Sequence, residues 1–473
     1  MAITSQRPGV VLAIASTAAF MASLDVFIVN VAFNSIGADF HHPSLAQLSW
    51  VLSAYAIVYA ALLVPAGRIA DRYGRKGGFL LGIALFTLAS AACAASGDVW
   101  WLVAFRAAQA AGAALLTPAS LGLVLATAPA QHRQRSVRIW AATGAVAAAL
   151  GPAVGGVLVE ASWRWVFLVN VPVGVAALVA TALWVPRSRD KSITDLPDML
   201  GAALLAVSIG ALTLGVVKGP DWGWAAARTD VAWFVTVAAA LGFLVSSARH
   251  SAPVIAPALL RVRAFTWSNA TAVLFAIPFA AALLTNVLWM QQVWHYSAIK
   301  TGFAVAPGPM MVPIFAAVAH RLAKRIPIGV IVAVGCVLFA GGGLITLSLV
   351  GASPHYAAEL LPGWLVGGVG VGFALPAILS SATADLPATH AATGSAVVTM
   401  SRQIGTALGV SLTVALLGHP VGYAAAHTAF QHAWWALAAV ALAGALTAPA
   451  MTPRAARPET AVVAAPTEAT SVA

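Results

Sequence analysis

The sequence has very little charge: Asp, Glu, Lys and Arg make up only 8% of its 473 residues, whereas a soluble domain carries roughly 25%. So few charges cannot cover a water-exposed surface of this size, which excludes a soluble enzyme or regulator. Cysteine is scarce too, because Cys93 and Cys336 are the only two and both lie in apolar runs. That excludes a disulfide framework and a cysteine-based metal site. Since 61% of the residues are hydrophobic, we predict a polytopic membrane protein.

Long apolar runs are present in place of charge. A membrane-spanning helix needs about 20 mostly apolar residues, and reading for such runs between polar breaks predicts fourteen spans. The alternating strand patterns that a membrane barrel requires are absent from the sequence, so the predicted fold class is an all-α polytopic membrane protein. The runs lie near residues 10–32, 47–67, 77–96, 99–126, 136–158, 165–185, 198–217, 231–248, 267–291, 302–320, 327–350, 360–383, 394–417 and 431–450.

Two wide polar breaks, near residues 186–197 and 249–266, divide these runs into groups. Two inserted helices leave the direction of the chain unchanged, so the six runs before them and the six after them begin on the same side, as two parallel repeats require. We therefore predict an N-terminal six-helix bundle at 1–186, two inserted linker helices at 187–258, a C-terminal six-helix bundle at 259–451 and a disordered cytoplasmic tail at 452–473.

The basic residues fall almost entirely on one side of the predicted spans. Of the 25 Lys and Arg, 19 lie on the side of the N-terminus, 4 lie on the other side, and Arg106 and Arg402 lie inside spans. Cytoplasmic loops carry the excess of positive charge, so both termini are predicted to be cytoplasmic. This distribution accounts for the net charge of +11 and excludes a nucleic-acid partner, because the basic residues do not cluster on one soluble surface.

Asp25 is the only acidic residue well inside a predicted span. From the rise per residue of a helix, Asp25 lies about 22 Å above the start of its span, which is near residue 10. Arg106 lies about 10 Å below the start of its own span, which is near residue 99 at the opposite face of the membrane. In a hydrocarbon core of roughly 30 Å the two depths agree, so we expect the two side chains to pair. An ionisable residue in a span is a functional candidate by default. The alternative is a static ion pair that only fastens two helices.

The loop between the second and third runs reads GRIADRYGRK over residues 67–76. Its composition alone fits a tight turn on the positively charged side of the membrane. The order of its residues resembles the signature loop of the major facilitator superfamily almost residue for residue. The resemblance implies a conformational latch in which Asp71 faces the N-terminus of a helix of the other bundle, beginning near Gly394. The residues assigned to this latch are Gly67, Asp71, Arg72, Gly74, Arg75 and Lys76.

Further stretches resemble one branch of that superfamily, the 14-helix drug–proton antiporters of the Qac type. Three of them are LDVFIVNVAFN over residues 24–34, RAAQAAG over 106–112 and WRWVFLVNVPVG over 163–174. A fourth, GPAVGG, resembles the antiporter motif and consists of Gly151, Pro152, Gly155 and Gly156 with two residues between them. The chain departs from the family patterns at Phe27, Asn34, Ala110 and Ala147. The resemblance covers about residues 10–450 and is weaker in the C-terminal half.

The resemblance implies a secondary-active exporter that moves amphipathic drugs or antibiotics outward in exchange for protons, by alternating access. It implies a multi-pass protein of the bacterial cytoplasmic membrane that is not an enzyme, needs no cofactor beyond the proton gradient, and uses Asp25 and Arg106 for proton coupling. Its partners would be protons, the lipid bilayer and a small amphipathic substrate, for which a cationic, a neutral and an anionic compound all stay open, and it would act as a monomer. The alternative is a proton-coupled importer, or an exporter of an endogenous small metabolite or lipid.

Polar side chains inside the spans are candidates for lining a substrate cavity. Helix-to-helix hydrogen bonding is the alternative role for amides in membrane spans. Arg402 is the only charged residue within the spans of the second half. The sequence favours neither of two roles for it, binding of substrate and hydrogen bonding to a backbone carbonyl. The candidates are Asn30, Gln109, Asn286, Gln291 and Arg402.

Overall fold

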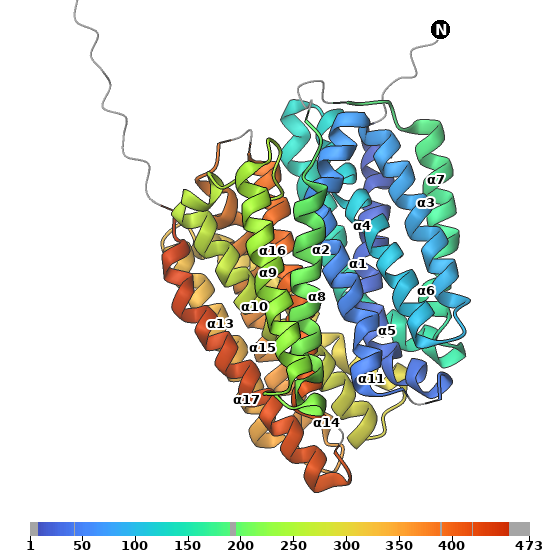
Figure 1. Ribbon diagram of the computed structural model, residues 1–473, viewed down its shortest axis with the longest axis vertical. Helices are drawn as coiled ribbons and strands as arrows, with labels where there is room; N and C mark the ends of the chain where they lie inside the picture. Colours follow the sequence, from blue (N-terminus) through green and yellow to red (C-terminus); the bar gives the residue numbers. More distant parts are fainter. Residues whose placement is uncertain (1–7, 42, 190–194, 388–389, 419, 454–473) are drawn as a thin grey trace, which may run out of the picture.

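The computed structural model describes residues 8–41, 43–189, 195–387, 390–418 and 420–453. Every regular element in these ranges is a helix, and 14 spans are long and apolar enough to cross a membrane (Figure 1). The predicted all-α fold class is thereby confirmed. Most of the tail predicted at 452–473 lies outside the described residues.

The helices are numbered along the chain. The N-terminal spans are α1 (Pro8–Asp39), α2 (Leu45–Tyr73), α3 (Arg75–Ala94), α4 (Val99–Thr127), α5 (Arg133–Ala161) with the short η1 (Ala130–His132) before it, and α6 with α7 (Trp165–Leu168 and Asn170–Trp184). The next two are α8 (Met199–Trp222) and α9 (Ala227–Arg249). The C-terminal spans are α10 (Arg263–Leu288), α11 with α12 (Ala298–Val305 and Pro307–Leu322), α13 (Ile328–Leu349), α15 (Leu361–Ala384), α16 (Ala391–Leu417) and α17 (Tyr423–Thr447). Short helical turns adjoin some of them: η2 (Leu259–Arg261) precedes α10, the π-helical turn η3 (Trp289–Val293) continues it, α14 (Tyr356–Glu359) precedes α15, and η4 (Ala448–Met451) follows α17.

Two spans are broken where the sequence analysis expected continuous helices. The run at 165–185 is divided into α6 and α7 at Val169, and the run at 302–320 is divided into α11 and α12 at Ala306. In each case a proline, Pro172 or Pro307, lies just beyond the break. Proline has no backbone N–H and its ring clashes with the carbonyl four residues earlier, which explains why the helix is interrupted at these points.

The first six spans and the last six pack in the same way. In the first group α1 packs against α5 and α3 against α4, and in the second α10 packs against α16 and α13 against α15. Glycines allow the same close approach in both groups: a Cβ on Gly155 of α5 would lie 3.0 Å from the carbonyl oxygen of Ile28, and one on Gly405 of α16 would lie 2.6 Å from that of Val273. Small residues at such interfaces let helix backbones come together. We call these groups the N-bundle and the C-bundle; their limits at 186 and 259 remain predictions.

The most extensive contacts between the two bundles are made by two pairs of helices. The helix α2 packs against α16, and α5 packs against α11. The inserted pair lies over the first of these contacts, because α8 packs against α9, α2 and α16 together. In Figure 1 the pair is drawn in green between the blue helices of the N-bundle and the yellow to red helices of the C-bundle. The inserted pair therefore touches both bundles through α8.

Candidate proton site and inter-bundle contacts

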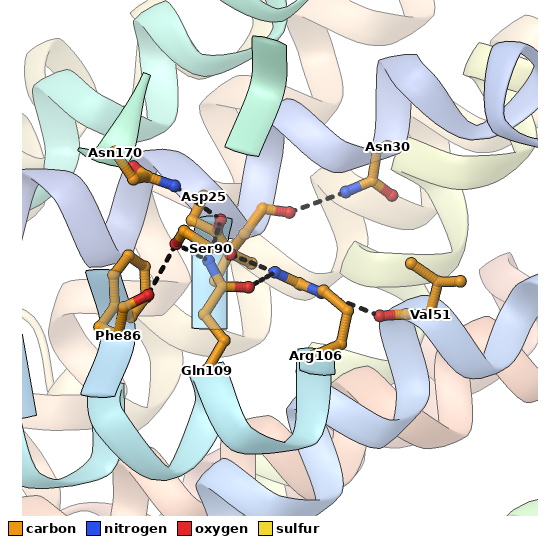
Figure 2. A network of polar contacts seen from close by, with 9 residues as sticks. Asp25, Asn30, Val51, Phe86, Ser90, Arg106, Gln109 and Asn170 are labelled. Carbon is orange, nitrogen blue, oxygen red and sulfur yellow. Dashed lines mark hydrogen bonds and ion pairs between the residues drawn. The ribbon is translucent and has the colours of Figure 1, made fainter. Parts of the chain in front are cut away.

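Asp25 lies near the middle of α1 and is completely buried, with 0% of its surface exposed. Its carboxylate accepts hydrogen bonds from three side chains (Figure 2). Arg106 donates from Nη1 to Oδ2, while Gln109 and Asn170 donate to Oδ1 over 2.8 and 3.2 Å. Two donors come from α4 and one from α7, so this single acid connects three helices of the N-bundle.

Arg106 is buried, with only 1% of the residue exposed, and its guanidinium makes several contacts. Besides Asp25, it donates to Gln109 Oε1 over 2.6 Å and from Nε to the carbonyl oxygen of Val51 over 3.1 Å. The centre of the guanidinium lies 4.2 Å from the ring centroid of Tyr55, a cation–π distance. Its partners on α1 and α2 thus hold α4 against both helices.

The network extends to a fifth helix through Gln109. The Nε2 group of Gln109 donates to Ser90 Oγ over 2.7 Å, and Ser90 in turn donates to the carbonyl oxygen of Phe86 over 2.8 Å. Arg106 and Gln109 are three residues apart on α4, a spacing that puts both side chains on one face of a helix. A buried, fully hydrogen-bonded ion pair is tolerated in a low-dielectric core, whereas removal of one partner leaves a costly unpaired charge. The state of the Asp25 carboxyl therefore affects five helices.

The contact between Asp25 and Arg106 that the depth argument predicts is present in the structure. Gln109, expected as a cavity residue, lies in the same network. Their role in proton coupling stays a prediction. Sequence reasoning missed Asn170, Ser90 and Tyr55 as partners of this pair. Asn170 gave a signal, because it is a polar residue within an apolar run; Ser90 and Tyr55 gave none.

The loop between α2 and α3 is held by an ion pair within the N-bundle and by a backbone bond to the segment that follows it. Asp71 Oδ1 accepts a hydrogen bond from Arg75 Nε over 2.6 Å, and the backbone N–H of Arg75 bonds to the carbonyl oxygen of Ser188. Gly74 separates the two helices with a φ of +123°, a conformation that glycine adopts readily. The structure gives no hydrogen bond from Asp71 to the first turn of α16 among the described residues, so the latch to that helix stays a prediction.

The other residues assigned to the latch lie around this turn. Lys76 donates from Nζ to the carbonyl oxygen of Ala182 at the end of α7. Arg72 lies over the ring of Tyr73 at 5.3 Å, and Gly67 faces Pro118 of α4. All of these partners belong to the N-bundle.

The four residues of the antiporter motif give α5 two closely packed faces. Gly151 and Gly155 face α1, where a Cβ on Gly151 would lie 2.7 Å from Phe27 Cβ. Gly156 faces the C-bundle instead, since a Cβ there would lie 2.6 Å from the carbonyl oxygen of Ala298 on α11. The carbonyl of Pro152 faces α11 as well. The motif therefore lies where the two bundles touch.

The remaining candidate cavity residues differ in what they contact. Asn30 donates to the carbonyl oxygen of Val26 in its own helix, and Asn286 accepts a hydrogen bond from Trp434 within the C-bundle. Gln291, in the π-helical turn, donates to the carbonyl oxygen of Val31 over 3.1 Å and so joins α10 to α1. Of these three amides, only Gln291 bonds across the two bundles.

Arg402 lies in the middle of α16 and is partly buried. Its guanidinium makes no hydrogen bond and no ion pair with any described residue. The helix α16 packs against α2, whose Tyr59 lies within electrostatic range of this guanidinium and donates from its hydroxyl to Thr117 Oγ1 over 3.0 Å. Arg402 therefore faces the N-bundle.

Two similarly packed bundles of six spans each, an inserted pair of spans between them and an ion pair enclosed in one bundle define a multi-pass membrane transporter. The model of the Major Facilitator Superfamily matches residues 15–410, and the chain belongs to that family. This match and the curated relatives described next together confirm the resemblance to the 14-helix drug-exporter branch, and the protein is a transporter, not an enzyme.

Curated relatives support the same branch. The chain is 33% identical over 406 residues to the multidrug resistance protein Stp of Mycobacterium tuberculosis (strain CDC 1551 / Oshkosh), covering 84% of this chain and 74% of the relative. It is 30% identical over 405 residues to the methylenomycin A resistance protein of Streptomyces coelicolor, covering 85% and 84%. It is 31% identical over 418 residues to the tetracenomycin C resistance and export protein of Streptomyces glaucescens, covering 88% and 77%.

Solved structures share the fold at low sequence identity. A POT family transporter in complex with 5-aminolevulinic acid aligns with a TM-score of 0.67 at 15% identity, covering 92% of this chain and 94% of that one. A bacterial homologue of the lysosomal transporter Spinster, in an inward-facing and unoccupied conformation, aligns with a TM-score of 0.65 at 16% identity, covering 95% and 97%. These likenesses concern the fold alone.

Proposed function

We propose that this protein is a proton-coupled secondary-active exporter of amphipathic drugs or antibiotics. The observation that carries the proposal is the Asp25 carboxylate, enclosed in the N-bundle and bonded to Arg106, Gln109 and Asn170. It is the one titratable acid deep in the described spans. The names of the relatives, which are resistance and export proteins, favour drugs as the cargo.

We place both termini in the cytoplasm of a bacterial cell. Support comes from the sequence, in which 19 of the 25 Lys and Arg lie on the side of the N-terminus. Cytoplasmic loops are the ones that carry an excess of Lys and Arg. In that orientation α5 runs outward, and its contact with α11 at Gly156 lies toward the outer face. The proton gradient across the membrane is then the energy source.

The proton step acts on the partners of Asp25. When the carboxyl takes up a proton it loses its charge, so Arg106 no longer has a counter-charge in a region that excludes water. The guanidinium keeps only its bonds to Gln109 and Val51 and its contact with the Tyr55 ring. Repacking of α4 against α1, α2 and α7 then relieves the unpaired charge. Release of the proton restores the network.

Alternating access supplies the transport step. Substrate is held between the bundles near the midplane, as in other transporters built from repeats. The two bundles rock about their contacts, α2 with α16 and α5 with α11. The repacking within the N-bundle biases which side is open, so that protons move in as substrate moves out.

The experiment is efflux from reconstituted vesicles under an imposed pH gradient. The substrates are ethidium, a cation, together with pyrenebutyrate and its uncharged amide, and the variants are wild type, Asp25→Asn and Glu160→Gln. Glu160 is an exposed acid at the end of α5, so its change is a matched carboxyl-to-amide control. We expect uphill export by wild type and by Glu160→Gln, and no uphill export by Asp25→Asn. Accumulation in the opposite direction, or no response to the gradient, would contradict the proposal.

A further inference from the structure

The two arginines inside the spans have opposite surroundings. Arg106 is enclosed, donates hydrogen bonds to three partners and lies against an aromatic ring. The guanidinium of Arg402 makes no hydrogen bond or ion pair in the part of the chain that the structure describes, and only the backbone carbonyl of this residue accepts a side-chain bond, from Thr406. Arginine remains charged in proteins under all ordinary conditions. The region around Arg402 therefore carries an uncompensated positive charge in this conformation.

The position of Arg402 on α16 shows which way this charge faces. One side of α16 packs on α10, because Gly405 and Gly409 approach its backbone and Ser401 donates to Asn269. Another side, with Val397 and Met400, is buried with apolar residues of α2 and α8. A stripe of partly exposed polar residues lies between these sides at intervals of four, three and four residues, which is one face of a helix. It consists of Ser395, Thr399, Arg402 and Thr406.

The helix α2 of the N-bundle packs against α16 and carries a hydroxyl group within electrostatic range of Arg402. Tyr59 of α2 interacts electrostatically with Arg402, and its hydroxyl donates to Thr117 of α4. Thr117 is itself partly exposed. Arg402 of the C-bundle and Tyr59 of the N-bundle, which is bonded to Thr117, therefore lie on helices that pack together and within electrostatic range of each other, near the middle of their spans. That is where the proposed function places the substrate.

The carboxylate of Asp25 does not balance this charge. It is completely buried inside the N-bundle and already bonded to Arg106. Taking an unpaired guanidinium out of water costs several kcal/mol, so such groups in membrane proteins face water or an opposite charge. A guanidinium in a partly dry site binds a carboxylate strongly through two parallel hydrogen bonds.

From these observations we infer that Arg402 is an anion-recognition site, which binds the acidic group of an amphipathic substrate held between the two bundles. Tyr59 and Thr117 contribute hydroxyl groups from the opposite side. This inference rests on the proposed export function and names its substrate class: amphipathic acids with a carboxylate or a similar anionic group. Because it concerns binding, it can be tested without a proton gradient.

The test compares two probes that differ only in charge, pyrenebutyrate and pyrenebutyramide. Binding to the purified full-length protein in lipid nanodiscs is followed by energy transfer from its tryptophans to pyrene. The variants are Arg402→Gln, Arg402→Lys and, as a matched control, Arg228→Gln at an exposed position on α9. A charged hydrogen bond to a carboxylate predicts that wild type binds the acid about tenfold more tightly than the amide.

We expect Arg402→Gln to lose this preference while keeping its affinity for the amide, which also shows that the variant is folded. Arg402→Lys should keep part of the preference, because it retains the charge without the planar fork. Arg228→Gln should behave as wild type. Equal affinities for the two probes in wild type, undetectable binding of the acid, or an unchanged acid preference in Arg402→Gln would overturn the inference. If Arg402→Gln binds neither probe, loss of the acid preference in Arg402→Lys also overturns the inference and its partial retention supports it.

Failure of this inference and failure of the proposed function are distinguishable. Absence of uphill efflux for every compound would refute proton-coupled export while the acid preference in nanodiscs stood. Intact uphill efflux together with equal binding of acid and amide would refute only the anion site.

Discussion

Replacing Asp25 with asparagine tests the proton site and keeps the shape of the side chain. The asparagine oxygen can still accept from Gln109 and Asn170, as Oδ1 does now. The other position changes from an accepting oxygen to an amide N–H₂ group facing the Arg106 guanidinium. Asp25→Asn therefore removes the titratable group and leaves a buried arginine without its counter-charge.

Leaving Arg106 buried without its counter-charge lowers the stability of the protein, and a second substitution can restore that stability without restoring the titratable group. Breaking a buried ion pair by removing one partner destabilises a protein by about 3–5 kcal/mol. Arg106 keeps its hydrogen bonds to Gln109 and Val51, so we expect Asp25→Asn to insert and fold with stability reduced by this amount or less. In the double variant Asp25→Asn with Arg106→Gln no charge remains, and most of the lost stability should return.

Proton coupling should not return with the stability. Thermal unfolding in nanodiscs measures the stability of wild type, Asp25→Asn and the double variant with Arg106→Gln. Uphill efflux from vesicles under a pH gradient measures coupling, and exchange of substrate across vesicles without a gradient measures the movement of the bundles. We expect both variants to lose uphill efflux, and the double variant to retain exchange.

One result would refute this reasoning directly. If the double variant performs uphill efflux at the rate of wild type, then Asp25 and Arg106 are a static pair that only fastens α1 to α4. Wild-type uphill efflux by Asp25→Asn alone would lead to the same conclusion.

Two further substitutions test the contacts between the bundles. Gly156→Ala places a Cβ 2.6 Å from the carbonyl oxygen of Ala298. Overpacking of this kind costs about 1–3 kcal/mol, so we expect α5 to move away from α11. Spin labels at the adjoining ends of the two helices would show this as a longer distance. Gly341→Ala on α13, where no atom lies within 4 Å of the new methyl group, should leave that distance unchanged, and an unchanged distance in both variants would speak against the contact. Asp71→Asn removes the ion pair with Arg75 and, if Asp71 also latches the bundles in the outward-facing state, should increase the mean distance between labels on cytoplasmic loops of opposite bundles. Distances identical to those of wild type would leave only the local role of that loop.

Hydropathy and loop charge were enough to predict the fourteen spans, because lipid requires about 20 apolar residues for each crossing. Helix rise alone predicted the pairing of Asp25 with Arg106, since both depths follow from distance along a straight helix. Asn170 joins the site from a span that the depth argument did not consider. The breaks at Val169 and Ala306 depend on nearby prolines. Each proline lies within a long apolar run, and hydropathy alone reads such a run as one continuous helix. Which face of α16 carries Arg402 toward α2 is a matter of tertiary packing, which a single sequence does not reveal.

The enclosure of Asp25 limits how protons and substrate can influence one another. In this conformation every hydrogen-bond partner of its carboxylate belongs to the N-bundle, so a substrate between the bundles does not touch it. Under the proposed function the coupling is therefore conformational, and α2 is the helix placed to transmit it. Tyr55 of α2 covers Arg106, and Tyr59, one turn further along the helix and stacked on Tyr55 at 6.0 Å, lies within electrostatic range of Arg402 on α16, the helix of the C-bundle that packs against α2. A shift of Arg106 on protonation of Asp25 moves the ring that it contacts, and with it the surface that α2 presents to α16.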